Sequence, residues 1–131
     1  MHVFTDCSKE PSLRRTAAAI CIPVFRVVRA FLLTNHLSVF STELFAIVLA
    51  LEWIIEFNPL SVVILSDSLS TLKALESLQD GCRNDLVLEV WHLVNIAKWR
   101  GLVVHLCWIP AHVGIGGNET CDLAAKHALK L

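Results

Sequence analysis

The run Leu60–Leu65 constrains the fold of this chain more than any other segment. It is rich in Val, Ile and Leu, and it follows Asn58-Pro59, a pair that stops a preceding helix. Runs of this kind are typical of a central strand that is covered on both faces. Such strands belong to α/β sheets that carry helices on each side. The remaining segments should therefore supply further strands and the helices that cover them.

The composition narrows the class of protein. The chain has 131 residues, 55% of them hydrophobic, and a mean hydropathy of +0.61. Intrinsic disorder is excluded, because it needs low hydrophobicity and high net charge. A membrane span is not indicated either, because charged residues and Pro interrupt the apolar stretches before about 20 lipid-facing residues accumulate. The chain opens without a secretory leader pattern, so we expect an intracellular protein without membrane contact.

The pattern of strands and helices predicts one domain over residues 1–131, since no repeat or low-complexity linker divides it. The expected order is βββαβααβα, an α/β fold with a five-stranded mixed sheet and helices on both faces. The expected strands are His2–Cys7, Thr16–Ile22, Val24–Leu33, Leu60–Leu65 and Leu102–Ile109. The expected helices are Ser41–Phe57, Asp67–Leu78, a third one ending at Gly101, and Asn118–Leu131. The expected connections include Ser8–Arg15, Gln79–Arg83 and the glycine-rich loop Pro110–Gly117.

The cysteines and three tryptophans are expected to be structural. The five cysteines include no CxxC pair, which favours reduced, buried thiols over a disulfide framework or a zinc site. Trp53, Trp91 and Trp99 lie within apolar helices, so core packing is expected rather than base stacking.

Four acidic residues occupy unusual places on this map. Asp6 ends the first strand, Asp67 follows the central strand, Glu43 lies in the first turn of the first long helix, and Asp122 lies one turn into the last. Ligand sites in α/β sheets gather outside the carboxyl ends of strands, so Asp6 and Asp67 become neighbours if their strands pair in parallel. Four clustered carboxylates repel unless a cation holds them. An all-oxygen set suits Mg²⁺ or Mn²⁺.

Each of these residues also has a simpler structural explanation. Asp6 fits a turn, and Asp67 fits a helix cap. Glu43 suits a helix N-terminus, and Asp122 can pair with Lys126 at i, i+4. Each residue taken singly is explained by its place in the fold, so the prediction of a metal site depends on all four residues acting together.

Four segments resemble the motifs of ribonuclease H type 1, in that family's order and over nearly the whole chain. They are Val3–Lys9, Ser41–Leu44, Leu65–Ser68 and Trp108–Asp122. The last reads Trp-Ile-Pro-Ala-His-Val-Gly-Ile-Gly-Gly-Asn-Glu-Thr-Cys-Asp and is the most specific. It is typical of the RNase H domains of animal non-LTR retrotransposons, which adjoin a reverse transcriptase.

The resemblance implies a ribonuclease H-like fold and an endonuclease that hydrolyses the RNA strand of RNA–DNA hybrids, leaving 5′-phosphomonoesters. Two Mg²⁺ ions, or Mn²⁺ as a substitute, would be held by Asp6, Glu43, Asp67 and Asp122 in a two-metal-ion mechanism. His112 would assist proton transfer and product departure. The nucleic-acid contacts implied are Cys7, Ser8, Ser38, Ser68 and Asn118.

The expected partners follow from the same resemblance and from charge. The RNA–DNA hybrid is the substrate, and a reverse transcriptase domain of the same element is a second partner of an otherwise monomeric domain. Met1 lies one residue before the first strand, so we expect a fragment of a longer polyprotein. Residues 1–30 carry five basic and two acidic side chains, a net charge of +3 against −4 elsewhere. This N-terminal third is therefore the expected contact with a polyanion.

Cys7 is the main departure from the family pattern, which usually has Gly there because backbone approaches the nucleic acid closely. A side chain at this position could crowd the RNA, or the thiol could face away. Gln79–Arg83 is also too short for the basic protrusion of some members. Cys7 and the altered substrate-contact residues, which include Val39 and Phe40, favour an alternative: a catalytically inactive module retained for nucleic-acid binding or as a scaffold. The intact carboxylates oppose it. An integrase or exonuclease of the same superfold is disfavoured, because those place their acids differently.

Overall fold

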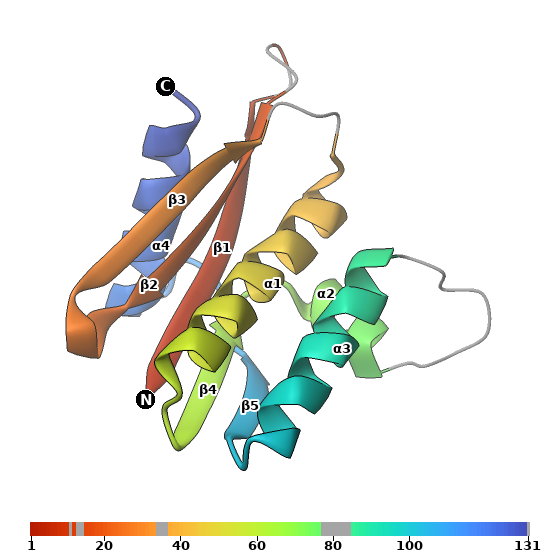
Figure 1. Ribbon diagram of the computed structural model, residues 1–131. Helices are drawn as coiled ribbons and strands as arrows, with labels where there is room; N and C mark the ends of the chain where they lie inside the picture. Colours follow the sequence, from red (N-terminus) through yellow and green to blue (C-terminus); the bar gives the residue numbers. More distant parts are fainter. Residues whose placement is uncertain (11, 13–14, 34–36, 77–84, 131) are drawn as a thin grey trace.

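The computed structural model describes residues 1–10, 12, 15–33, 37–76 and 85–130 (Figure 1). The strands are β1 (His2–Glu10), β2 (Arg15–Ile22), β3 (Val27–Leu33), β4 (Ser61–Ser66) and β5 (Val103–Trp108). The helices are α1 (Val39–Phe57), α2 (Leu69–Glu76), α3 (Asp85–Trp99) and α4 (Gly116–Ala128), with a 3-10 helix η2 (Pro23–Phe25) between β2 and β3. This order confirms the predicted βββαβααβα pattern.

The five strands form one mixed sheet in the order β3-β2-β1-β4-β5. β1, β2 and β3 pair antiparallel as a meander, whereas β1 pairs with β4 and β4 with β5 in parallel. The predicted α/β fold is therefore confirmed. Thr5 on β1 pairs with Ser66 on β4, so Asp6 and Asp67 both follow this pair at one edge of the parallel strands.

Helices cover both faces of the sheet, with α1, α2 and α3 on one side and α4 on the other (Figure 1). Alternation along the strands sends successive side chains to opposite faces. Val3 and Ile20 pack in the core beneath α1 and α3, whereas Phe4 and Ala19 pack against α4. β2 presents Ala and Cys to α4, and these small side chains allow the helix to lie close to the sheet.

Several boundaries differ from the predicted ones. β1 continues to Glu10, so part of the predicted turn is strand. The third strand begins at Val27 rather than Val24, because η2 begins with Pro23 and Arg26 then adopts a left-handed conformation with φ 53°. α1 begins at Val39, since Ser38 caps it by accepting a hydrogen bond from the Ser41 amide.

α1 and α4 both begin before their predicted first residues, so two acidic residues lie further along their helices than predicted. Glu43 lies in the second turn of α1 rather than the first, and Asp122 lies nearly two turns into α4, which begins at Gly116. The prediction that Asn58 ends α1 is confirmed, because Asn58 adopts a left-handed conformation there and its amide bonds to Ile54. Leu78, Gln79–Arg83, Cys82 and Leu131 lie outside the described residues.

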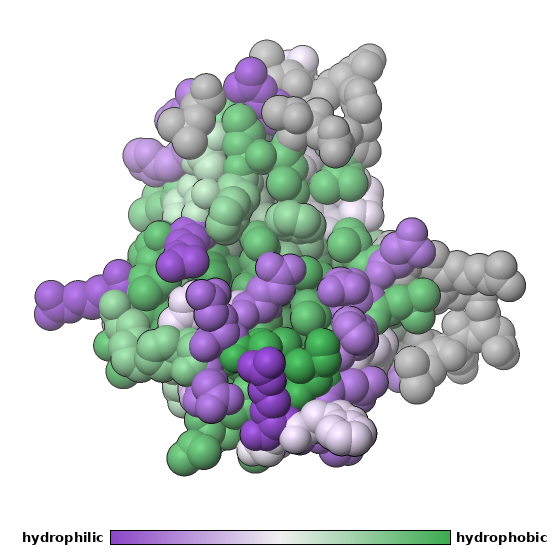
Figure 2. Space-filling model, viewed as in Figure 1, coloured by the Kyte–Doolittle hydropathy of each residue, from purple (hydrophilic) through white to green (hydrophobic). Residues whose placement is uncertain are grey.

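The surface is more apolar than predicted in two places. Trp99 is 91% exposed at the end of α3, so its predicted core position is wrong, and Leu60 is 83% exposed before β4. Trp53 stacks on Phe57 at a centroid distance of 4.6 Å, and Phe25 lies 4.7 Å from Phe57. Figure 2 shows hydrophobic side chains between scattered hydrophilic ones on the face that carries α1 and α3.

The cysteines follow the prediction only in part. The four within the described ranges are free thiols. Cys21 and Cys121 are buried, whereas Cys107 is exposed on β5 and Cys7 is half-buried. Within those ranges, no helix combines the length and the apolar character needed to cross a bilayer.

Candidate metal-binding active site

Three carboxylates from three separate segments converge at the edge of the parallel strands. Asp6 on β1, Glu43 on α1 and Asp67 after β4 each place an oxygen within 4.8 Å of the others. Asp6 and Glu43 are only 5% and 4% exposed, and Asp67 is half-buried. The predicted meeting of these three residues is confirmed. The parallel register of β1 and β4 brings Asp6 close to Asp67. α1 packs against the sheet and places Glu43 beside them.

Burial and mutual repulsion keep this cluster from ionising fully. Burial, and then the charges of Asp67, Glu43 and Asp122, raises the pKa of Asp6 from 3.8 to about 8. Burial also raises the pKa of Glu43 to about 7, with the charge of Asp67 adding to the shift. Hydrogen bonds from Cys7 oppose both shifts. A positive charge beside these carboxylates would therefore favour their ionised forms.

The residues fit a divalent cation. The Glu43 Oε2 atom is buried and has no hydrogen-bond partner in the described part of the chain. A buried carboxylate oxygen without a partner is costly, and a bound cation would satisfy it. Three carboxylate oxygens are the donors that Mg²⁺ and Mn²⁺ prefer.

Cys7 contacts two of the three carboxylates. Its amide donates to Asp6 Oδ1 at 2.8 Å, and its thiol donates to Glu43 Oε1 at 3.0 Å. The Sγ atom also lies 3.8 Å from the Val39 carbonyl oxygen. Burial beside these acids raises the pKa of Cys7, which keeps the thiol protonated as a donor. Sequence reasoning missed the thiol contact, because residue spacing does not show which side chain of α1 meets β1.

Asp67 is tied to the loop and the helix that follow β5. Asn118, at 2% exposed, donates its amide to Asp67 Oδ2 at 3.3 Å. The Trp108 indole N–H donates to the Asp67 carbonyl at 3.3 Å, and the Ile109 amide donates to Ser66 at 2.9 Å. Both ends of the loop 109–115 are thereby attached to the end of β4. The expected contact of Asn118 with nucleic acid stays a prediction, separate from its observed hydrogen bond to Asp67.

Asp122 stands apart from the other three acids. It forms an ion pair with Lys126 at 2.9 Å, which confirms the i, i+4 explanation. It does not belong to the group of oxygens within 4.8 Å, although its charge is close enough to raise the pKa of Asp6. Its role as a fourth metal ligand stays a prediction.

His112 is exposed on the loop between β5 and α4. Its φ of 56° is left-handed, and Gly114 follows with a φ of 83°. Since the residues at both ends of the loop bond to Asp67 after β4, the loop that carries His112 begins and ends beside this acidic residue. Its part in proton transfer stays a prediction.

The three serines predicted to contact nucleic acid lie on β1, before α1 and after β4, the segments that carry the three carboxylates. Ser8 is half-buried on β1, directly after Cys7. Ser38 is exposed, and its Oγ caps α1 by accepting the Ser41 amide at 3.0 Å. Ser68 follows Asp67, and its Oγ lies 2.7 Å from Thr71 Oγ1. Contacts of these residues with nucleic acid stay predictions.

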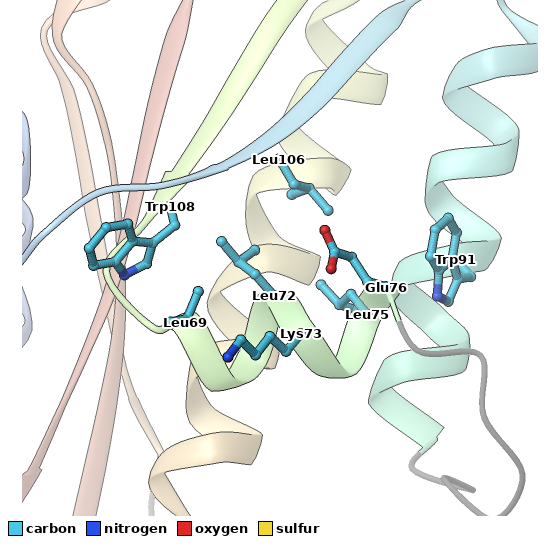
Figure 3. A pocket seen from close by; sticks show the side chains of 8 residues that line it. All are labelled: Leu69, Leu72, Lys73, Leu75, Glu76, Trp91, Leu106 and Trp108. Carbon is cyan, nitrogen blue, oxygen red and sulfur yellow. The ribbon is translucent and has the colours of Figure 1, made fainter.

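A separate apolar pocket of about 300 Å³ lies between α2, α3 and β5 (Figure 3). Its lining consists of Leu69, Leu72, Lys73, Leu75, Glu76, Trp91, Leu106 and Trp108. Only Lys73 and Glu76 are charged in this set, and none of the three clustered carboxylates belongs to it. The pocket therefore lacks the convergent polar groups that chemistry requires, and the acidic cluster is the better candidate site.

The chain that carries this acidic cluster matches a known protein family. Residues 1–130 match the RNase H family, so the match covers nearly all of the chain. The five-stranded sheet in the order β3-β2-β1-β4-β5, with four helices, is consistent with that match. The chain belongs to the RNase H family.

Proposed function

We propose that this chain is a divalent-metal-dependent endonuclease that hydrolyses the RNA strand of RNA–DNA hybrids and leaves 5′-phosphomonoesters. One observation carries the proposal. Asp6, Glu43 and Asp67 bring oxygens within 4.8 Å of one another, in a chain that belongs to the RNase H family. Buried carboxylates that raise one another's pKa are typical of sites that bind cations and substrates.

The residues divide the work as follows. Asp6, Glu43 and Asp67 hold the metal, and Asp122 joins them when its side chain leaves Lys126. Paired Mg²⁺ ions, or Mn²⁺ in their place, supply activation of a water and stabilisation of the leaving 3′-oxygen when bound. His112 moves a proton at the leaving group. The 2′-hydroxyls distinguish the RNA strand from DNA.

The hybrid is held by small polar residues and by the basic N-terminal third of the chain. The nucleic-acid contacts in this proposal are Cys7, Ser8, Ser38, Ser68 and Asn118. Lys9, Arg26 and Arg29 are exposed on or beside the meander and supply positive charge. The Trp108–Asp122 segment supports an origin in a non-LTR retrotransposon, with a reverse transcriptase domain as partner to this monomeric unit.

The test is cleavage of a labelled RNA–DNA hybrid by purified, folded protein in Mg²⁺ or Mn²⁺, with EDTA and duplex DNA as controls. Cutting of the RNA strand alone, lost in EDTA, is the expected result. Folded protein that cuts nothing at high concentration contradicts the proposal. It would support the inactive module instead, which the engagement of Asp122 with Lys126 favours.

A further inference from the structure

We propose that Cys7 is a positioning residue of the metal centre, which orients Asp6 and Glu43 through two separate hydrogen-bond donors. The inference rests on the metal-binding part of the proposed function. It differs from both alternatives that the sequence left open, a side chain that crowds the RNA and a thiol that faces away, because the thiol bonds to Glu43. Two hydrogen bonds donated by Cys7 support it, together with the buried oxygen Oε2 of Glu43.

The first donor is the backbone amide of Cys7. It donates a hydrogen bond to Asp6 Oδ1 at 2.8 Å, so the bond joins two residues that are neighbours in the sequence. This bond depends on the strand conformation of β1, so any residue at position 7 that keeps that conformation retains it. The amide contact therefore gives no reason for a cysteine.

The second donor is the thiol, and it is specific to the side chain. The Sγ atom lies 3.0 Å from Glu43 Oε1. This bond joins β1 to α1 across 36 residues of sequence. It occupies one oxygen of the Glu43 carboxylate, while the other, Oε2, is buried without a partner among the described residues. The terminal torsion of Glu is broad, so an untethered carboxylate would turn over a wide range. The thiol selects one orientation and leaves Oε2 as the free ligand oxygen.

Orienting contacts of this kind have measurable effects on metal affinity. Loss of a hydrogen bond that orients a ligand typically costs roughly 10-fold to 100-fold in affinity. Cys7→Ala and Cys7→Val each remove the donor, and the larger Val side chain leaves no cavity in place of the thiol. We expect both to weaken Mn²⁺ binding by about 10-fold. Cys7→Ser retains a donor at the same position and should restore most of the affinity.

The experiment measures Mn²⁺ affinity directly, by electron paramagnetic resonance of free Mn²⁺ titrated into the metal-free full chain. The matched control is Cys107→Ser, because Cys107 is an exposed thiol on β5 that contacts the Trp108 carbonyl. Its affinity should equal that of the wild type. Circular dichroism verifies folding, and either donorless variant that folds is sufficient for the comparison.

The outcomes separate this inference from the proposed function. Donorless variants with wild-type affinity, or a Ser variant as weak as they are, would overturn the positioning role alone. Wild-type protein that binds no Mn²⁺ would overturn the metal-binding part of the proposed function and this inference together. Mn²⁺ binding that depends on Cys7, without any cleavage of hybrid, would retain this inference and reject the nuclease.

Discussion

Gly117 on α4 packs directly against the aromatic ring of Phe4 on β1. A Cβ atom built at Gly117 would overlap the ring, at 2.6 Å from Phe4 Cζ. Phe4 is 6% exposed, so the ring has little room to move away. This contact sets how closely the start of α4 approaches the sheet. It thereby places Asn118, the next residue, where it bonds to Asp67.

Gly117→Ala should therefore destabilise the protein. Overpacking of a core typically costs about 1–3 kcal/mol. We expect the free energy of unfolding, measured in urea, to fall by that amount. Gly116→Ala is the matched control, since a Cβ at Gly116 meets nothing within 4 Å. Surface changes of that kind are usually within about 0.5 kcal/mol. Equal stability of the two variants would refute the close approach.

Asp67→Asn should abolish cleavage and leave the fold intact. The change removes a charge from the acidic cluster with little change in shape, and the Asn side chain keeps an amide oxygen that can accept the hydrogen bond from Asn118. Loss of one transition-state stabiliser typically lowers kcat by roughly 10²–10³. Hybrid cleavage and circular dichroism measure the two effects. Activity equal to that of the wild type would reject the metal mechanism.

The metal-free protein should lose stability as the pH rises. Burial and neighbouring charges place the folded-state pKa of Asp6 at about 8 and that of Glu43 at about 7, above their ordinary values of 3.8 and 4.5. Between these limits the folded protein binds more protons than the unfolded chain, so the free energy of unfolding decreases with pH. Thermal melts in EDTA at about pH 5 and about pH 8 measure the change.

Mg²⁺ should reverse much of this loss, because a cation favours the ionised carboxylates and binds the folded state. The stabilisation by Mg²⁺ should therefore be greater at the higher pH. Asp6→Asn provides the control, since it removes the most strongly shifted group and should flatten the pH dependence. A metal-free protein that gains stability from pH 5 to pH 8 would contradict the charge repulsion.

Lys126→Gln should strengthen Mg²⁺ binding. Lys126 pairs with Asp122 at 2.9 Å and competes with a metal ion for that carboxylate. The pair is partly exposed, with the Lys126 side chain 55% exposed, so it has the modest strength of a surface ion pair. We expect roughly a threefold gain in affinity by calorimetry at low salt, decreasing as salt screens the pair. Lys98→Gln on α3 is the control, and weaker Mg²⁺ binding by Lys126→Gln would refute the competition.

Much of the fold could be predicted from the amino-acid sequence, because hydrophobic period and helix-ending residues act locally. The apolar run before Ser66 and Asp67 identified the central strand, and Asn58-Pro59 identified the end of α1. The bounds were less accurate where two local signals conflict. Pro23 suggested a simple break between strands, whereas η2 and the left-handed Arg26 occupy three further residues there.

The residue types of the candidate site could be predicted better than the contacts between its side chains. Asp6 and Asp67 could be placed together, because parallel pairing brings strand ends to one edge. Spacing could not show that the Cys7 thiol bonds to Glu43, since that contact joins a strand to a helix 36 residues away. Trp99 illustrates the same limit, since it is apolar by sequence but 91% exposed at a helix end.

The sequence by itself determined the family motifs, the order of elements and the identity of the acidic residues, because these depend on composition and local pattern. Only the tertiary structure decided which acids meet. Asp6, Glu43 and Asp67 converge, while Asp122 turns to Lys126. The physical reason is that burial, pKa and hydrogen bonding arise from the packing of α1 and α4 against opposite faces of the sheet, and chain order alone does not specify that packing at the level of single atoms.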